Sequence, residues 1–382
     1  MIKKLLPFYL VALVILSLAV IYGCGANPTG GGGGGTSHAH GRYSYLGTQS
    51  PGDIWKWTID TGTFSGTNET TGFWVTGTWE PLSSGFGKAF VSTSEGPGAV
   101  PVGSLVYFLE FPDTMLVVHP ASIDETKANV IACAARSTDQ PIADKKYVAV
   151  NMPRKSWKYD TDDAYGYVHL QANGDSPDLW DLGMVNFILD GSLPSTLWNA
   201  TAESYADGVF SGGYKDSLAG SCPPRDVSNL NVFITPSKIY LGDYGPDEGG
   251  FVGVYIPDDY TFDSIEASTH EFKGLEFKYY ADSATGETHP ISLSSADPGT
   301  LNIHRYRNDD VGSTPFSTTE ATLALGTYES DTMIISSEMT DGSTTPIKAV
   351  MARIGSARKY VYFGIGACPD GTPINLFIVQ SD

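Results

Sequence analysis

Short alternating runs of apolar and polar residues, separated by turn residues, make up most of the chain beyond its N-terminal segment. In one such run, Trp55, Trp57 and Ile59 alternate with polar residues. A period of two places successive side chains on opposite faces and indicates a half-buried β-strand. A short helix is arguable only at residues 179–184 and 193–204. The sequence therefore predicts an all-β fold.

The predicted strands are short and number roughly twenty, which is typical of β-sandwiches and β-barrels. Because one hydrophobic core rarely serves more than about 250–300 residues, we expect the 382 residues to form two such lobes of antiparallel strands. A polar segment rich in glycine and proline follows residue 205, so we place β domains at residues 42–205 and 206–382. A single continuous β structure without a boundary is the alternative.

Two faint sequence echoes connect the halves of the chain. Residues 132–136 are similar to residues 350–353, and residues 103–113 are similar to residues 250–258. The spacing between the echoes differs from one half to the other. An internal duplication with insertions and a chance similarity of strand and turn residues both remain open.

The N-terminal segment has the organisation of a signal peptide. Lys3 and Lys4 precede an apolar run at residues 5–20, which is short for a membrane span because a spanning helix needs about 20 apolar residues. The run ends in the sequence Ile-Tyr-Gly-Cys, with the cysteine at position 24. Residues 1–23 are therefore predicted to be cleaved. An uncleaved anchor helix and a plain secretory signal are the alternatives.

Ile21-Tyr22-Gly23-Cys24 resembles the lipobox of bacterial lipoproteins. The resemblance covers this segment alone and implies cleavage before Cys24, diacylglycerol on its thiol and a further acyl chain, such as palmitate, on its amine. Two or more chains anchor a protein stably. By analogy with the same family, Gly25 favours the outer membrane of the cell envelope, whereas nothing indicates which face of it displays the protein.

Residues 24–41 read as a flexible tether, since they contain six consecutive glycines. A coil of this length would hold the folded part about 20–25 Å from the lipid. The chain has 43 acidic and 23 basic residues, giving a net charge of −20. This acidic balance argues against nucleic acid or anionic lipid headgroups as partners of the folded part. The predicted partners are the membrane, through the lipid, and envelope proteins or polysaccharide.

With Cys24 assigned to lipid, three cysteines remain: Cys133, Cys222 and Cys368. Three allow at most one disulfide. Cys133 lies in an apolar run and reads as a buried small residue, whereas Cys222 and Cys368 each precede proline in a loop-like context and are the favoured pair. The sequence does not determine the pairing.

No catalytic motif is complete. His270-Glu271 starts a zinc-protease motif, but the second histidine is absent, and no Gly-x-Ser-x-Gly elbow occurs. We therefore expect no enzymatic activity.

Two groups of residues are candidates for ligand binding. Asp160, Asp162 and Asp163 place three carboxylates in one short segment, which suits calcium, although acidic turn residues are the expected background of such a chain. No other cofactor is expected. Trp74 lies on the strand face opposite Val75 and is the better surface candidate for stacking on a sugar, whereas Trp55 and Trp57 read as core.

The sequence thus predicts a lipid-anchored, non-catalytic envelope protein with a role in adhesion, scaffolding or ligand binding. A calcium-dependent or carbohydrate-binding module is the alternative. A hydrolase on a β scaffold is the third reading.

Overall fold

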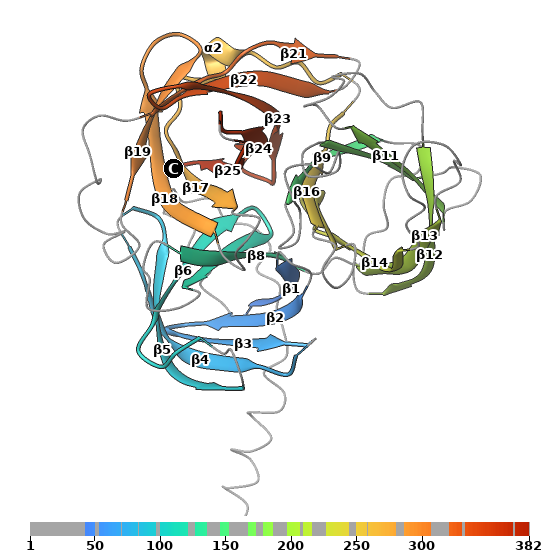
Figure 1. Ribbon diagram of the computed structural model, residues 1–382, viewed down its shortest axis with the longest axis vertical. Coiled ribbons are helices and arrows are strands. Elements are labelled where there is room, and N and C mark those ends of the chain that lie inside the picture. The colour runs from blue at the N-terminus through green and yellow to red at the C-terminus, as the bar shows by residue number, and fades with distance from the viewer. Residues whose placement is uncertain are drawn as a thin grey trace, which may run out of the picture. The chain divides into compact units, whose positions relative to one another are not determined.

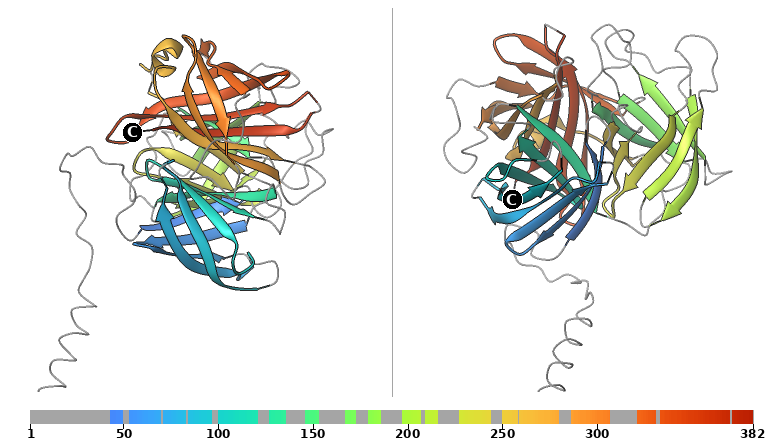
Figure 2. Two further views of the ribbon diagram at one scale, coloured as in Figure 1. Left: turned by 90° about the vertical axis from the view of Figure 1, so that its left-hand side faces the viewer. Right: turned by 60° about the horizontal axis from the view of Figure 1, so that its bottom comes forward.

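The fold was analysed on a computed structural model. It describes these residues: 43–49, 53–69, 71–82, 84–96, 100–120, 127–135, 146–152, 167–172, 179–185, 197–206, 209–215, 227–243, 250–257, 259–279, 286–306, 321–330, 333–369 and 371–381. Most of these residues lie in antiparallel β-strands, which confirms the all-β prediction. Figures 1 and 2 show the strands curving into barrels.

Eight consecutive strands form a first closed ring, which we call ring 1. Each strand pairs with the next, and the first strand also pairs with the eighth, so the sheet has no open edge. The strands are β1 (Tyr43–Gln49), β2 (Asp53–Asp60), β3 (Thr63–Asn68), β4 (Trp74–Pro81), β5 (Gly87–Glu95), β6 (Leu105–Phe111), β7 (Thr114–Pro120) and β8 (Lys127–Ala135).

The next eight strands form ring 2 in the same way, closed by pairing of its first and eighth strands. This ring is drawn in green to yellow in Figure 1. Its strands are β9 (Lys146–Met152), β10 (Tyr167–Ala172), β11 (Leu179–Val185), β12 (Leu197–Ala206), β13 (Val209–Lys215), β14 (Val227–Ile234), β15 (Ile239–Asp243) and β16 (Gly250–Tyr255).

The C-terminal strands form ring 3, which again closes through its first and last strands. A short helix, α2 (Ser264–Ala267), precedes ring 3 in the sequence. The two-residue strand β21 (Tyr328–Glu329) is not one of the ring strands and pairs with β22. The eight ring strands are β17 (Phe272–Tyr279), β18 (Gly286–Ser295), β19 (Thr300–Arg305), β20 (Ala321–Ala324), β22 (Ile334–Thr340), β23 (Thr344–Ile354), β24 (Lys359–Ala367) and β25 (Pro373–Gln380).

The described strands form two sheets, one that contains rings 1 and 3 and one that is ring 2, which agrees with the predicted two β lobes, although one lobe comprises two rings. The expected boundary after residue 205 falls at the β12–β13 hairpin, whose strands pair inside ring 2. The two segments where a short helix was arguable contribute to β11 and β12 instead. A two-residue ladder between β8 and β18 joins the sheets of rings 1 and 3.

Alternation of side chains divides the described core into three parts. Trp57, Phe64 and Val117 are among the inward-facing residues that fill ring 1. A separate cluster that includes Ile303 and Met351 fills ring 3. Outward-facing apolar residues of all three rings join in one further cluster. The parts of the outer faces that meet in this cluster are therefore also buried, as in near-continuous hydrophobic strands that are covered on both sides.

In each ring, the hairpin between the sixth and seventh strands lies at the cluster that the three rings share. The residue just before the seventh strand is left-handed in every case: φ is 57° at Asp113, 62° at Lys238 and 51° at Arg358. Such φ values are uncommon outside glycine, and only one other described non-glycine residue has one. Ser237 donates a hydrogen bond to the Asp113 carboxylate, which links two of these hairpins. The three rings therefore repeat one architecture.

Neither of the two sequence echoes follows this repeat. The first relates the eighth strand of ring 1 to the sixth strand of ring 3, and the second relates the sixth strand of ring 1 to the eighth strand of ring 2. Because the echoed segments hold different positions in their rings, they do not mark corresponding parts of a duplication.

Candidate functional site

One end of ring 3 is closed by α2. Asp263 caps the helix by accepting hydrogen bonds from the backbone N–H groups of Ile265 and Glu266. Ala267 is buried in the cluster inside the ring, and the Ser268 hydroxyl accepts a hydrogen bond from Gly299 N at 2.8 Å. The described side chains inside the ring next to the helix are apolar.

Polar side chains gather inside the ring toward its opposite end. In β17, Leu275 and Phe277 point outward into the cluster shared by the rings, so Glu276 and Lys278 point inward. Arg305 of β19 lies across from Ile291, which is part of the inner cluster. Asp341 directly follows β22. Four charged residues from three neighbouring parts of the wall thus meet inside one barrel.

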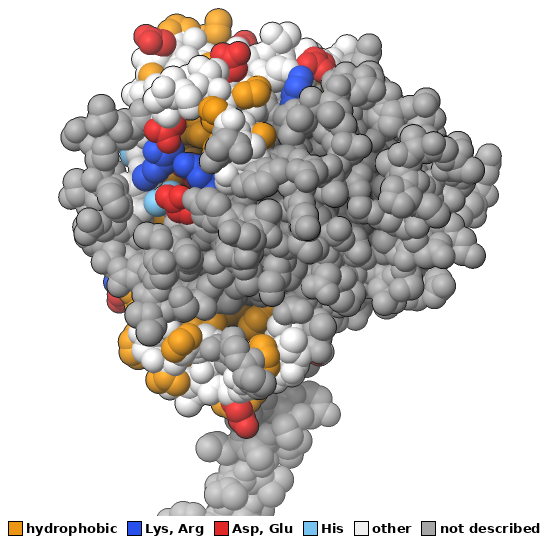
Figure 3. Space-filling model, in the orientation of Figure 1, with side chains coloured by type: hydrophobic (Ala, Val, Ile, Leu, Met, Phe, Trp, Pro, Cys, Tyr) orange, Lys and Arg blue, Asp and Glu red, His pale blue; other side chains and the backbone are white. Residues whose placement is uncertain are grey.

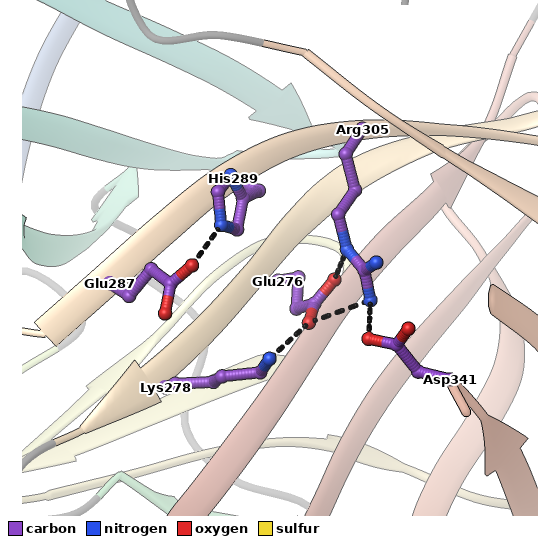
Figure 4. Close-up of polar contacts among 6 residues, drawn as sticks. All are labelled: Glu276, Lys278, Glu287, His289, Arg305 and Asp341. Atoms are coloured by element: carbon purple, nitrogen blue, oxygen red, sulfur yellow. Dashed lines mark hydrogen bonds and ion pairs between the residues drawn. The ribbon is translucent and has the colours of Figure 1, made fainter. Parts of the chain in front are cut away.

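Glu276 is the centre of this group, and its side chain is wholly buried. Arg305 binds both of its carboxylate oxygens, with Nε 2.6 Å from Oε2 and Nη2 3.1 Å from Oε1 (Figure 4). The same Nη2 donates to Asp341 Oδ2 at 2.8 Å, and Lys278 Nζ lies 3.6 Å from Glu276 Oε1. Two carboxylates and two cations form a balanced chain, which we call the ionic cluster.

The surroundings of Arg305 stabilise its protonated form. Burial alone would lower the pKa of Arg305, but the carboxylates of Glu276 and Asp341 outweigh it, and the pKa lies above its ordinary value. A two-pronged bond between a guanidinium and a carboxylate is among the stronger polar contacts in proteins. Even so, the desolvation of two buried charges is costly, and apolar residues of similar volume in their place often make a protein equally stable or more stable. A barrel that needed stability alone would fill this layer with apolar side chains.

A second acid–base pair lies beside the ionic cluster on β18. His289 Nε2 is 2.6 Å from Glu287 Oε1, and His289 stands directly across from Glu276 in the β17–β18 ladder. In Figure 3, basic, acidic and histidine side chains gather at one place over these strands. The open end of ring 3 is therefore lined with ionisable groups.

A pocket of about 320 Å³ opens next to the ionic cluster. This volume lies within the range of small-molecule sites. Its lining offers an ammonium, a carboxylate, hydroxyls, a thiol and a thioether. The lining residues are Lys278, Met339, Asp341, Ser343, Thr345, Cys368, Pro369 and Thr372. Such a mixture suits a small polar molecule.

The aromatic residues lie as the sequence indicated. Trp57 is wholly buried inside ring 1, and Trp55 stacks on it with ring centroids 5.4 Å apart, so both are core residues. Trp74 lies on the outer face of ring 1, partly exposed, and its indole N–H donates to Glu95 Oε2 at 3.1 Å. Its role in sugar binding stays a prediction.

The remaining predicted site residues are not described by the structure. Cys24, Asp160, Asp162 and Asp163 lie outside the described residues. Within the described ranges, no group of three or more His, Cys, Asp or Glu side chains is placed to hold a metal ion.

Among the described residues Cys368 forms no disulfide, and its favoured pairing with Cys222 stays a prediction. Cys222 itself lies outside the described residues. Cys368 lines the pocket beside the ionic cluster.

The ionic cluster was not predicted from the sequence, although the alternation of charged and apolar residues in β17 could have indicated it. Glu276 and Lys278 alternate with Leu275 and Phe277, a pattern that normally indicates a solvent-facing polar edge. In a closed ring whose outer face is also covered, the same alternation turns the charged side chains inward. The run of residues alone does not distinguish these two arrangements.

Comparisons with known proteins place the chain in no family. No family model and no curated protein matches it. Among solved structures, it is similar to a protein of unknown function from the DUF3598 family of Nostoc punctiforme, with 11% identity, a TM-score of 0.25, and coverage of 62% of this chain and 96% of that one. It is also similar to a mutant of the vaccine antigen transferrin binding protein B from Haemophilus parasuis, with 9% identity, a TM-score of 0.23, and coverage of 89% and 75%. TM-scores this low carry no argument about function.

None of the helices in the described ranges has the length and apolar character needed to cross a membrane.

Proposed function

We propose that this chain is a lipid-anchored, non-catalytic protein of the bacterial outer membrane that binds a small polar ligand at the open end of ring 3. The observation that carries the ligand-binding role is the wholly buried Glu276, held by Arg305 beside an open pocket. Buried charges are costly, so a charged layer next to a pocket favours a role in recognition over a role in stability.

The anchor rests on the sequence. The lipobox-like segment ending at Cys24 would place two or more acyl chains on the N-terminus, and the glycine-rich tether would let the β rings reach ligands away from the lipid. Binding without turnover is in keeping with the site, because Glu276, Arg305 and Asp341 are already held by opposite charges.

A ligand screen tests the binding role. The full-length protein, purified in detergent micelles, would be melted against a library of small polar metabolites and against calcium and EDTA. A ligand present at 100 times its dissociation constant adds about 2.7 kcal/mol, which raises the midpoint by about 5–10 °C. The same shift should be absent from a Glu276→Leu/Arg305→Met variant. A library without any shift would reject the binding role, and chemical change of a bound compound would reject the non-catalytic role.

A further inference from the structure

Building on the proposed ligand-binding role of ring 3, we propose that the ligand is a small hydroxylated carboxylate, of the sugar-acid class, whose carboxylate binds Lys278. Among the described residues that line the pocket, Lys278 is the one cation, and the lining also offers groups that suit hydroxyls. These two halves set both the chemistry of the ligand and its orientation.

Lys278 is the group that selects the carboxylate. Its side chain is 21% exposed, and its ionic contact within the described part of the chain is to Glu276 Oε1 at 3.6 Å, which is longer than a hydrogen bond. Arg305 already binds both oxygens of that carboxylate. The ammonium therefore keeps its N–H donors for the pocket, and a largely buried cation is best satisfied by an anionic acceptor.

The opposite lining favours hydroxyl groups. Asp341 gives one oxygen to Arg305 and retains further acceptor sites, while Ser343 and Thr345 add hydroxyls that both donate and accept. Asp341 would repel a second carboxylate, so the carboxylate of the ligand belongs at Lys278 and its hydroxyls at Asp341.

Charge also separates this ligand from its neutral and basic relatives. The two cations and two anions of the ionic cluster cancel, so the cluster itself carries no net negative charge that would attract an amine. Among the described residues that line the pocket, Asp341 is the one acid, and it is already paired with Arg305. A neutral sugar would give Lys278 hydroxyl acceptors alone. Since a carboxylate meets the ammonium as a full opposite charge and a hydroxyl does not, the acid should bind at least about tenfold more tightly than the neutral sugar.

Titration calorimetry on full-length protein in micelles tests the inference with three matched probes: D-glucuronate, D-glucose and D-glucosamine. We expect glucuronate to bind most tightly, with a dissociation constant at least about tenfold below that of glucose. Lys278→Gln should abolish this preference, and Lys278→Arg should keep most of it. Lys348→Gln is the control, because Lys348 lies on the outer face of the same ring, bonded to Glu329 and Ser336.

The outcomes distinguish this inference from the role on which it rests. Equal binding of glucose and glucuronate, or an unchanged preference in folded Lys278→Gln protein, would overturn the sugar-acid assignment and leave the binding role standing. The assignment would also be overturned, with the binding role intact, if none of the three probes binds while another class of compound clearly shifts the melting midpoint. If no compound of the wider library shifts the melting midpoint either, the binding role and the assignment fall together.

Discussion

Removal of Arg305 should destabilise ring 3 much more than removal of both Arg305 and Glu276. In an Arg305→Met variant, the two bonds at 2.6 and 3.1 Å disappear and a wholly buried carboxylate remains. Breaking a buried ion pair in this way costs about 3–5 kcal/mol. Lys278, at 3.6 Å, compensates in part, so we expect a loss near the lower end, about 3 kcal/mol.

The double variant Glu276→Leu/Arg305→Met removes the stranded charge. Replacing a buried ion pair with apolar residues of similar size is often neutral or stabilising, so most of the loss should be recovered. Thermal melts followed by circular dichroism measure both effects. The single variant should melt about 6–12 °C below the parent, and the double variant within about 3 °C of it.

A matched control is Lys348→Met, which removes an ion pair on the outer face of ring 3. Because that pair is partly exposed, its loss should cost less than about 1 kcal/mol. The reasoning fails if Arg305→Met melts within about 2 °C of the parent, or if the double variant melts no higher than the single one. Either result would mean that the charge of Glu276 is not compensated mainly by Arg305.

Four further predictions concern other parts of the chain. Gly66→Ala would place a methyl group 2.7 Å from the Trp57 ring, so it should cost about 1–3 kcal/mol in denaturant melts, and much less in a Trp57→Leu background. Arg358→Gly should raise stability by up to about 1 kcal/mol, because glycine adopts the φ of +51° without strain, and a lower midpoint would contradict this. Burial raises the pKa of Tyr362, so its contribution to stability is present below about pH 10 and is lost as pH rises further; Tyr362→Phe should flatten that decline in melts between about pH 9 and 12. Cys24→Ser should abolish labelling by a palmitate analogue and release the protein from membrane pellets, whereas continued pelleting would contradict the lipid anchor.

The strands could be predicted from the sequence because they depend on local alternation. Trp55, Trp57 and Ile59 are buried on one face, as their period of two indicated, and Trp74 lies on the face opposite Val75. Ring closure could not be predicted, since it depends on pairing between distant strands. β17, for example, pairs with both β18 and β25, and residue 272 lies opposite residue 380.

The ionic cluster escaped prediction for the same reason. Glu276, Arg305 and Asp341 are far apart in the sequence, and none lies in a recognisable motif. Their proximity follows from the ladders β17–β18 and β18–β19 and from the turn after β22. Only a closed barrel makes the polar face of a strand its interior.

Rings 1 and 3 show why the ionic cluster points to recognition. An eight-stranded barrel is just wide enough for side chains to fill it or for one small ligand to enter. Side chains fill ring 1: the ring centroid of Trp57 lies 6.0 Å from the ring centroids of both Phe64 and Phe108. Ring 3 shares that topology and the same outer cluster, yet its interior also contains the buried ion pair of Glu276 and Arg305. Because the shared architecture is stable with a filled interior, the charged layer of ring 3 is not a requirement of the fold and is best explained by what the pocket beside it binds.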